Sequence, residues 1–165
     1  MNTSIILSVI GPDKSGIVSD ISEIVKNHSG NIEKSRMIKL GDFFTIMVLV
    51  TINKDNIKNL ENELVSYSDY QISINELSKT FKDIDKGIHT IHLNGLDSEG
   101  LVYKVTNQLA ELGINIEELR TNIGNAPMSG VALFSLTAKI NHPELNYDLL
   151  KQKMDILATE LDVNI

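Results

Sequence analysis

Residues 11–18 read Gly-Pro-Asp-Lys-Ser-Gly-Ile-Val and stand where a short alternating apolar stretch gives way to a helical pattern. Residues 95–102, Gly-Leu-Asp-Ser-Glu-Gly-Leu-Val, repeat the Gly, Asp, Gly and apolar pair in the same places. A turn from a strand into a helix leaves backbone N–H groups unpaired at the positive end of the helix dipole. We therefore expect each turn to offer a seat for an anion, such as the carboxylate of a small ligand.

The similarity between the two halves extends beyond these turns. The offset of 84 residues persists into the next stretch, and we expect it to grow to 88 further on, which places four additional residues in loop 124–130. The first half has only a tight turn at residues 41–42 in that place. An insertion confined to a hairpin tip indicates two copies of one domain. The matched pairs are Asn31 with Asn115, Arg36 with Arg120, Phe44 with Ala132, Ile46 with Phe134, Val48 with Leu136, and Ile52 with Ile140.

Hydrophobic periodicity predicts a βαββαβ order in each copy. In the first copy we expect a strand at 5–9, a helix at 17–28, strands at 32–40 and 43–52, a helix at 57–67 and a strand at 72–77. In the second copy we expect a strand at 91–93, a helix at 101–112, strands at 114–123 and 131–140, a helix at 150–161 and a strand at 163–165. The predicted fold class is α+β, with two ferredoxin-like domains in tandem, each an antiparallel sheet with both helices on one face. The expected boundaries are 1–79 and 88–165, joined by a polar linker at 80–87.

The strand expected at 43–52 is apolar on both of its faces. Helices on one side of a sheet cover only one of those faces. A second copy of the domain or a second chain is therefore expected to cover the other face, which predicts a homo-oligomer.

Composition and charge argue against nucleic-acid binding and against contact with a membrane. The chain has 165 residues, a formal net charge of −7, no Cys and no concentrated run of Lys and Arg. Direct nucleic-acid binding needs a basic face, so we expect none. No apolar run approaches the length of a membrane span, and the N-terminal residues lack a signal-peptide pattern, so we expect a cytoplasmic protein without membrane contact.

The turn motif, together with Asn-Ile at the head of the second strand, resembles the ACT domain, a small regulatory module that binds amino acids between two copies. The resemblance covers nearly the whole chain. Residues 31–37, and residues 126–130 ahead of Leu133 and Phe134, resemble the tandem-ACT family of glycine cleavage system transcriptional repressors. That resemblance implies a non-enzymatic regulator that responds to glycine or a similar amino acid and acts through a protein partner, a LysR-type transcriptional activator.

The resemblance also implies a set of ligand-binding residues. The N–H groups of Gly16 and Ile17 are expected to hold a carboxylate, Asp13 to accept from an ammonium, and Asn31 to offer both a donor and an acceptor. Glu99 would repel a bound carboxylate in the second turn, so the first turn is expected to be the stronger seat. The candidate residues are Asp13, Lys14, Ser15, Gly16, Ile17 and Asn31 in the first copy, and Asp97, Gly100, Leu101 and Asn115 in the second.

Structural explanations stay open for the same residues. The turn glycines can serve backbone freedom alone, Asp13 or Ser15 can cap a helix, and the asparagines can form turns. Arg36 and Arg120 are expected to be solvated or ion-paired rather than partner contacts.

Catalytic and metal sites are not expected. Residues three apart on a strand point to opposite faces, so His89 and His92 cannot chelate one ion. The sequence contains no nucleophile elbow or phosphate-binding loop, and we expect no cofactor. The main alternative function is a ligand-free structural or oligomerisation module. A small ferredoxin-like hydrolase would need an Arg/Asn pair in one cleft, which no pattern here predicts.

Overall fold

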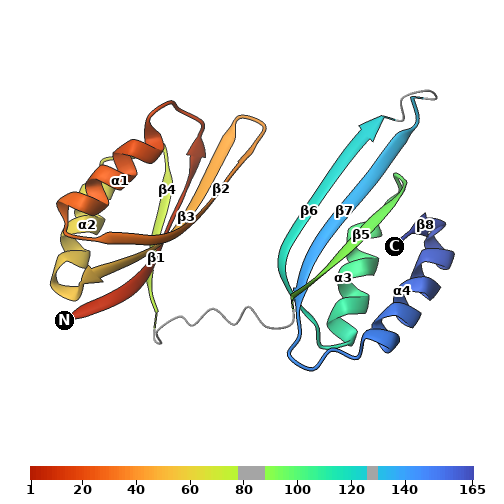
Figure 1. Ribbon diagram of the computed structural model, residues 1–165. Helices are drawn as coiled ribbons and strands as arrows, with labels where there is room; N and C mark the ends of the chain where they lie inside the picture. The colour runs from red at the N-terminus through yellow and green to blue at the C-terminus, as the bar shows by residue number, and fades with distance from the viewer. Residues whose placement is uncertain (78–87, 126–129) are drawn as a thin grey trace. The chain divides into compact units, whose positions relative to one another are not determined.

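The computed structural model describes residues 1–77, 88–125 and 130–165 (Figure 1). The predicted linker at 80–87 and most of the predicted loop insertion lie outside the described residues. The chain divides into two compact units, Met1–Lys82 and Asp83–Ile165, and each is described by itself.

The N-terminal unit follows the predicted βαββαβ order. Its elements are β1 (Asn2–Pro12), α1 (Ile17–Asn27), β2 (Asn31–Leu40), β3 (Phe43–Asn53), a short 3₁₀ helix η1 (Lys54–Asn56), α2 (Ile57–Leu64) and β4 (Gln71–Glu76). The strands form an antiparallel sheet in the order β2-β3-β1-β4, and α1 and α2 cover one of its faces (Figure 1).

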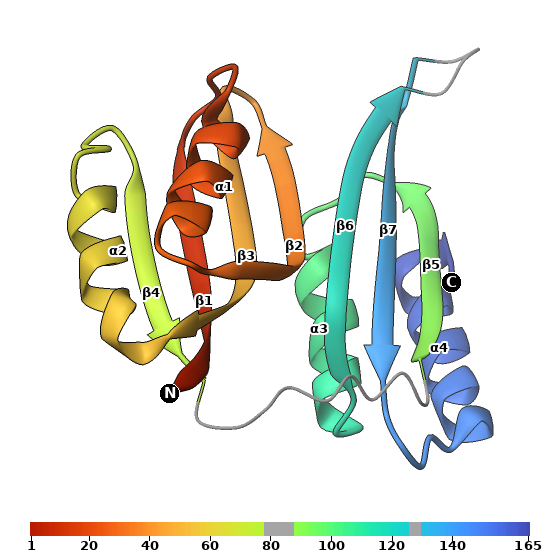
Figure 2. The same cartoon turned by 60° about the vertical axis from the view of Figure 1, so that its left-hand side comes forward.

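The C-terminal unit repeats this architecture. Its elements are β5 (Ile88–Leu96), α3 (Leu101–Glu111), β6 (Asn115–Asn125), β7 (Ala132–Asn141), α4 (Tyr147–Leu161) and β8 (Val163–Asn164). The sheet order β6-β7-β5-β8 corresponds strand for strand to the first sheet, and Figure 2 shows α3 and α4 on the same side of it. The predicted fold class, two ferredoxin-like antiparallel sheets each with helices on one face, is confirmed.

Each unit has a separate apolar core between its helices and its sheet. Alternate residues of the central strands point into it, and the helices contribute residues three and four apart, as the periodicity predicts. In the first core, Ile5, Leu7 and Val9 of β1 are fully buried beneath Ile21 and Val25 of α1. In the second, Leu93 and Leu136 meet Val105 and Leu109 in the same way.

The strand ladders correct one prediction about the repeat. Gly11 pairs with Phe44, and its counterpart Gly95 pairs with Phe134, so the offset at β3 and β7 is 90 residues rather than 88. The second hairpin is therefore six residues longer than the first, and Ile46 corresponds to Leu136. The error was invisible to pattern analysis because a shift of two residues leaves every side chain on the same face of the sheet.

The end of α2 also differs from the prediction. The helix stops at Leu64, and Tyr67 lies in the turn that follows, where its N–H donates to the Leu64 carbonyl at 3.1 Å. The Ser66 hydroxyl donates to the Glu63 carbonyl at 2.7 Å. Such local side-chain hydrogen bonds compete with helix continuation.

Among the described helices, none combines the length and the apolar character needed to cross a membrane.

Candidate ligand-binding turns

The turn between β1 and α1 places an unusual residue at the start of the helix. Gly16 is the N-cap of α1 with φ of 94°, in the left-handed region that favours glycine. The first helical hydrogen bond runs from Asp20 N–H to the Gly16 carbonyl at 2.9 Å. The N–H groups of Val18 and Ser19 come before it and so have no acceptor within the helix. Gly100 is the N-cap of α3 with φ of 82° and the same geometry.

No side chain caps the N-terminus of α1 or α3. The alternative that Asp13 or Ser15 serves as a helix cap is therefore wrong. By contrast, the Asn146 side chain accepts from Leu149 N–H at 3.0 Å at the start of α4, whereas α2, which continues from η1, has no side-chain cap. A Cβ added to Gly16 or Gly100 would meet nothing within 4 Å. The two repeated turns thus combine a positive helix end with open space.

Asp13 has a partner within the protein. Its Oδ2 accepts from Lys39 Nζ on β2 at 2.5 Å, and its backbone N–H donates to the Asp42 carbonyl at 3.0 Å. Both side chains remain partly exposed, so solvent screens the ion pair. Asp13 therefore already accepts from an ammonium, that of Lys39, in the place where the sequence predicts the ammonium of a ligand. Lys39 also neutralises the Asp13 carboxylate, which would otherwise repel an anion beside α1.

The residue after each turn glycine, Ile17 or Leu101, has a side chain in the core and a backbone N–H in the turn. The side chains of Ile17 and Leu101 are buried in the two cores, so only their backbone can face a ligand. Ile17 N–H makes a long turn hydrogen bond of 3.3 Å to the Lys14 carbonyl. Lys14, Ser15 and Gly16 themselves are exposed.

The C-terminal turn has a different charge balance. Asp97 N–H donates to the Ala132 carbonyl at 3.2 Å, as Asp13 N–H does to Asp42. However, Ser98 replaces Lys14, and Ile123 replaces Lys39. Within the described residues of this unit, Asp97 has no ion pair equivalent to that of Asp13. With both cations lost and Glu99 added, this turn suits an anion less than the first one does.

The two asparagines lie far from the turns of their own units. Asn31 pairs with Thr51 at one end of the sheet, whereas Gly11 pairs with Phe44 at the other end. At ~3.3 Å per residue along β3, the separation is about 23 Å. Asn115, which pairs with Asn141, occupies the same position in the second sheet. One unit alone therefore does not bring an asparagine and a turn to the same ligand.

The motif glycines Gly11 and Gly95 have a packing role that pattern analysis missed. A Cβ on Gly11 would lie 2.4 Å from Cδ1 of Tyr70, and a Cβ on Gly95 would lie 2.4 Å from Cγ1 of Val163. The Tyr70 hydroxyl also donates to the Pro12 carbonyl at 3.0 Å. Desolvation first, and then the carboxylates of Asp69, Asp13 and Asp20, raise the pKa of Tyr70 above its ordinary value, so the hydroxyl keeps its proton at neutral pH. The sequence signals the close approach through the glycine, but it does not say which side chain approaches.

A polar cluster lies on the face of the second sheet away from its helices. Glu118 accepts from Lys139 Nζ at 2.9 Å and from Arg120 Nε at 2.5 Å, which confirms the ion-paired interpretation of Arg120. These three residues and Thr137 line a shallow hollow of about 210 Å³. His92 Nδ1 lies 3.2 Å from the Thr137 hydroxyl, whereas His89 points to the opposite face.

We expect this cluster to show a measurable titration shift. The hydrogen bond from Lys139 is the main cause that holds the pKa of the Glu118 carboxyl below its ordinary value, with Arg120 adding to it. A lowered folded-state pKa stabilises the fold above the unfolded pKa, and that contribution is lost as pH falls through the folded value. In Lys139→Met, the pKa of Glu118 measured by carboxyl-carbon NMR should rise toward the ordinary value. Lys151→Met on α4 should leave it unchanged; an equal pKa in all three proteins would contradict the assignment.

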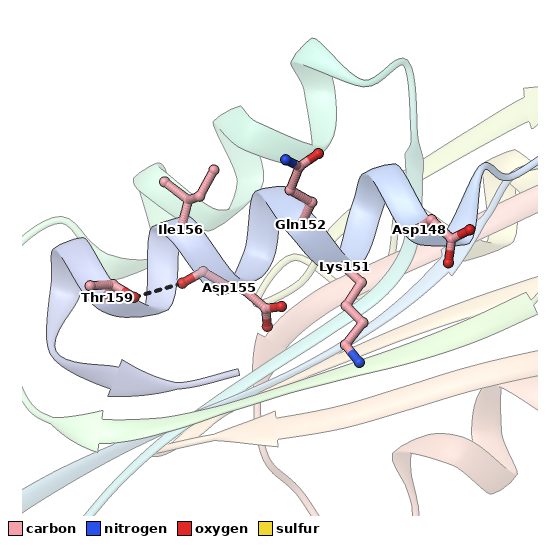
Figure 3. Close-up of a pocket in the computed structure, with 6 residues that line it drawn as sticks. All are labelled: Asp148, Lys151, Gln152, Asp155, Ile156 and Thr159. Atoms are coloured by element: carbon pink, nitrogen blue, oxygen red, sulfur yellow. Dashed lines mark hydrogen bonds between the residues drawn. The ribbon is translucent and has the colours of Figure 1, made fainter.

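A second hollow, of about 430 Å³, runs along the outer surface of α4 (Figure 3). All six residues that line it belong to this one helix, and the Thr159 hydroxyl donates back to the Asp155 carbonyl at 2.9 Å. None of the predicted site residues is among them. Among the described residues, no group of three His, Cys, Asp or Glu side chains is arranged to hold a metal ion.

Fold and turns together define the chain as a tandem α+β protein in which each repeated unit has an uncapped helix N-terminus directly after its first strand. Residues 3–72 match the family model of the ACT domain. The N-terminal unit is therefore an ACT domain. The match covers the N-terminal unit, and the C-terminal unit repeats its topology.

The chain is also similar to solved structures and to curated proteins. The crystal structure of an unknown protein from Galdieria sulphuraria is 35% identical, with 99% of this chain and 96% of that one covered and a TM-score of 0.88. A proposed glycine cleavage system transcriptional repressor shares the fold, with a TM-score of 0.71 at 21% identity over 99% of this chain and 95% of that one. A UPF0237 protein from Methanococcus maripaludis is 35% identical over 51 residues, 31% of this chain. The aligned stretch spans 57% of that relative's length.

Proposed function

We propose that this protein is a non-enzymatic regulator that binds a small amino acid, glycine or a similar one, at a contact between two ACT units. It controls transcription of amino-acid metabolism genes through a protein partner. The observation that carries the proposal is the N-terminus of α1, which has a left-handed glycine, no side-chain cap and open space before it. A carboxylate fits this position because it pairs with the unpaired N–H groups and the positive helix end.

The first turn is the proposed seat, and charge supports that choice. Lys39 neutralises Asp13, and Lys14 adds a second cation in the same turn. Asp20, in the first turn of α1, opposes these cations in part. The second turn, with Asp97, Gly100 and Leu101, is the weaker seat because both lysines are absent there.

The ligand's ammonium needs an acceptor, and we propose that an asparagine of a second ACT unit supplies it. Asn31 lies about 23 Å along the sheet from the turn of its own unit. A second ACT unit lying antiparallel alongside the exposed β2 edge would bring its own asparagine to this turn. The proposed site is therefore shared, and the asparagine is either Asn31 of a second chain or Asn115.

A thermal-shift panel of the twenty amino acids tests the proposal. An amino acid present at ~100 times its Kd should stabilise the protein by about 2.7 kcal/mol and raise Tm by several degrees. The response should weaken in Lys39→Ala, because the Asp13 carboxylate beside the proposed seat would lose its cation, whereas Ile123→Ala, the equivalent change in the second unit, should retain it. Loss in Asn31→Ala or in Asn115→Ala would identify which unit completes the site. A panel without any shift would overturn the proposal.

The proposed partner is a protein, in line with the family resemblance to regulators that act through a LysR-type activator. The acidic chain, with a net charge of −7, is unsuited to direct contact with DNA. Such a role places the protein in the cytoplasm. Co-purification of an activator from the native cell, strengthened by glycine, supports this arm; retention of the purified protein alone on DNA would contradict it.

A ligand-free oligomerisation module is the second candidate function. Two contacts favour it: Asp13 is already paired with Lys39, and Ile17 N–H is engaged by Lys14. The flat thermal-shift panel that overturns amino-acid sensing is the result this candidate predicts.

A further inference from the structure

The two sheets differ sharply on the faces that their helices leave uncovered. On the first sheet, five apolar side chains are exposed around Thr45, and we refer to them as the open-face patch. They are Ile10 (43% exposed), Ile38 (48%), Leu40 (72%), Phe43 (62%) and Met47 (51%). Ile10 and Ile38 both pair with Thr45, and Leu40 pairs with Phe43, so the five side chains surround Thr45 on one face of β1, β2 and β3.

The C-terminal unit provides an internal control for this patch. The counterparts of the patch residues are Asn94, Asn122, Gly124, Leu133 and Thr137, so four of the five apolar side chains are replaced. At the core positions of the same strands, both units stay apolar, as with Ile46 and Leu136. Because the same fold forms with a polar open face, the patch is not required for folding, and strand propensity alone does not account for it.

We propose that the open-face patch is a self-association surface, on which a second copy of this chain packs through the same patch to form a two-fold symmetric dimer of sheets. A flat apolar centre suits an isologous contact, in which each residue meets its own equivalent region. Two sheets can pack face to face at about 10 Å separation with side chains interdigitating. The surface is distinct from the helix N-terminus proposed as the ligand seat, so the two proposals can fail separately.

The area of the patch is consistent with this occupant. From the exposed fractions, the five side chains present roughly 500 Å², which is toward the upper end for a monomer's largest apolar patch. Two copies together bury roughly 1,000 Å² before any rim is counted, close to the ~1,200 Å² at which stable interfaces begin. The surroundings fit an interface rim, since Ser8, Ser73 and Arg36 border the patch on the same face.

The corresponding face of the C-terminal unit is a poor complement to the patch. It presents Glu118, Arg120, Lys139 and His92 at its centre. Covering these groups with apolar side chains would remove charges from water without new partners. An identical apolar patch carries no such cost.

Sedimentation equilibrium of the full chain, without added amino acid, tests the proposal with register-matched variants. Met47 lies opposite Arg36 and Ser8, and Thr137 lies opposite the equivalent Arg120 and His92. The wild type should dimerise at micromolar concentration. Met47→Glu should weaken the dimer about 100-fold or more, because each copy would bury a charge, and Thr137→Glu should leave it unchanged. Met47→Thr, which installs the residue of the other unit, should weaken it about tenfold.

Far-UV circular dichroism verifies that each variant is folded, which is expected because Met47 is half exposed. A wild type that stays monomeric would overturn the proposal. So would a Met47→Glu protein with wild-type association, or equal weakening by Thr137→Glu.

Discussion

Gly11→Ala is expected to destabilise the N-terminal unit by about 1–3 kcal/mol, although it adds a single methyl group. The new Cβ would lie 2.4 and 2.9 Å from ring atoms of Tyr70 and 3.0 Å from the Asp69 carbonyl. Tyr70 cannot move away freely, since its ring packs against the core and its hydroxyl holds the Pro12 carbonyl. Hydrogen exchange followed by mass spectrometry should show faster exchange in β1 and β4 and unchanged exchange in α3 and β7.

Two control proteins separate the Tyr70 clash from a general effect of losing glycine. In a Tyr70→Ala background, Gly11→Ala should cost much less, because the ring that it meets is absent. Gly95→Ala meets Val163 instead, on the two-residue strand β8 at the edge of its sheet. It should cost less than Gly11→Ala, because only two ladder pairs hold β8 in place. An equal cost of Gly11→Ala with and without Tyr70 would contradict the packing role.

Lys39→Glu is expected to weaken amino-acid binding about 10–30-fold. The change removes the cation paired with Asp13 and adds a second carboxylate beside the proposed anion seat. Two unit charges about 5 Å apart at a protein surface interact by a few kcal/mol before salt screening, which leaves about 1–2 kcal/mol at physiological ionic strength. Isothermal titration calorimetry with the amino acid found by thermal shift measures the effect, which should shrink in high salt.

The register-matched control is Ile123→Glu, which places the same charge at the equivalent position of the C-terminal unit. Ile123 is 59% exposed, so the substitution is tolerated by the fold. Binding should change little, since the first turn is the proposed seat. If Ile123→Glu weakens binding more than Lys39→Glu, the assignment of the seat to the first turn is wrong.

Much of the fold follows from the spacing of apolar residues. Strict alternation at Ile5, Leu7 and Val9 and helical spacing from Ile17 to Val25 indicate which face of each element is buried. The duplication supports each assignment a second time. The length of the second hairpin escaped prediction because period-two patterns cannot separate shifts of two residues. The end of α2 escaped prediction because the apolar spacing continues to Tyr67, which packs against the core from the turn that follows the helix.

Part of the candidate site could likewise be predicted from the sequence, and part of it could not. Glycine at the helix N-termini could be predicted because the local backbone conformation requires it, and both Gly16 and Gly100 have positive φ. The partners of the turn could not: Lys39 reaches Asp13 across the β2–β3 hairpin, and Tyr70 reaches Gly11 from a loop 59 positions later in the chain. Such contacts depend on which strands are neighbours and on side-chain direction, which local patterns do not specify. A shared ligand site depends further on how two units associate.

The most direct test is a titration of the ¹⁵N-labelled chain with glycine, followed by the backbone and side-chain amide signals. A carboxylate at the start of α1 should shift the Gly16, Ile17, Val18 and Ser19 signals saturably, together with the side-chain amide of Asn31 or Asn115. Signals around Gly100 should move less. Saturable shifts that leave the start of α1 untouched, or no shift with glycine or any other amino acid, would contradict an amino-acid seat at this helix.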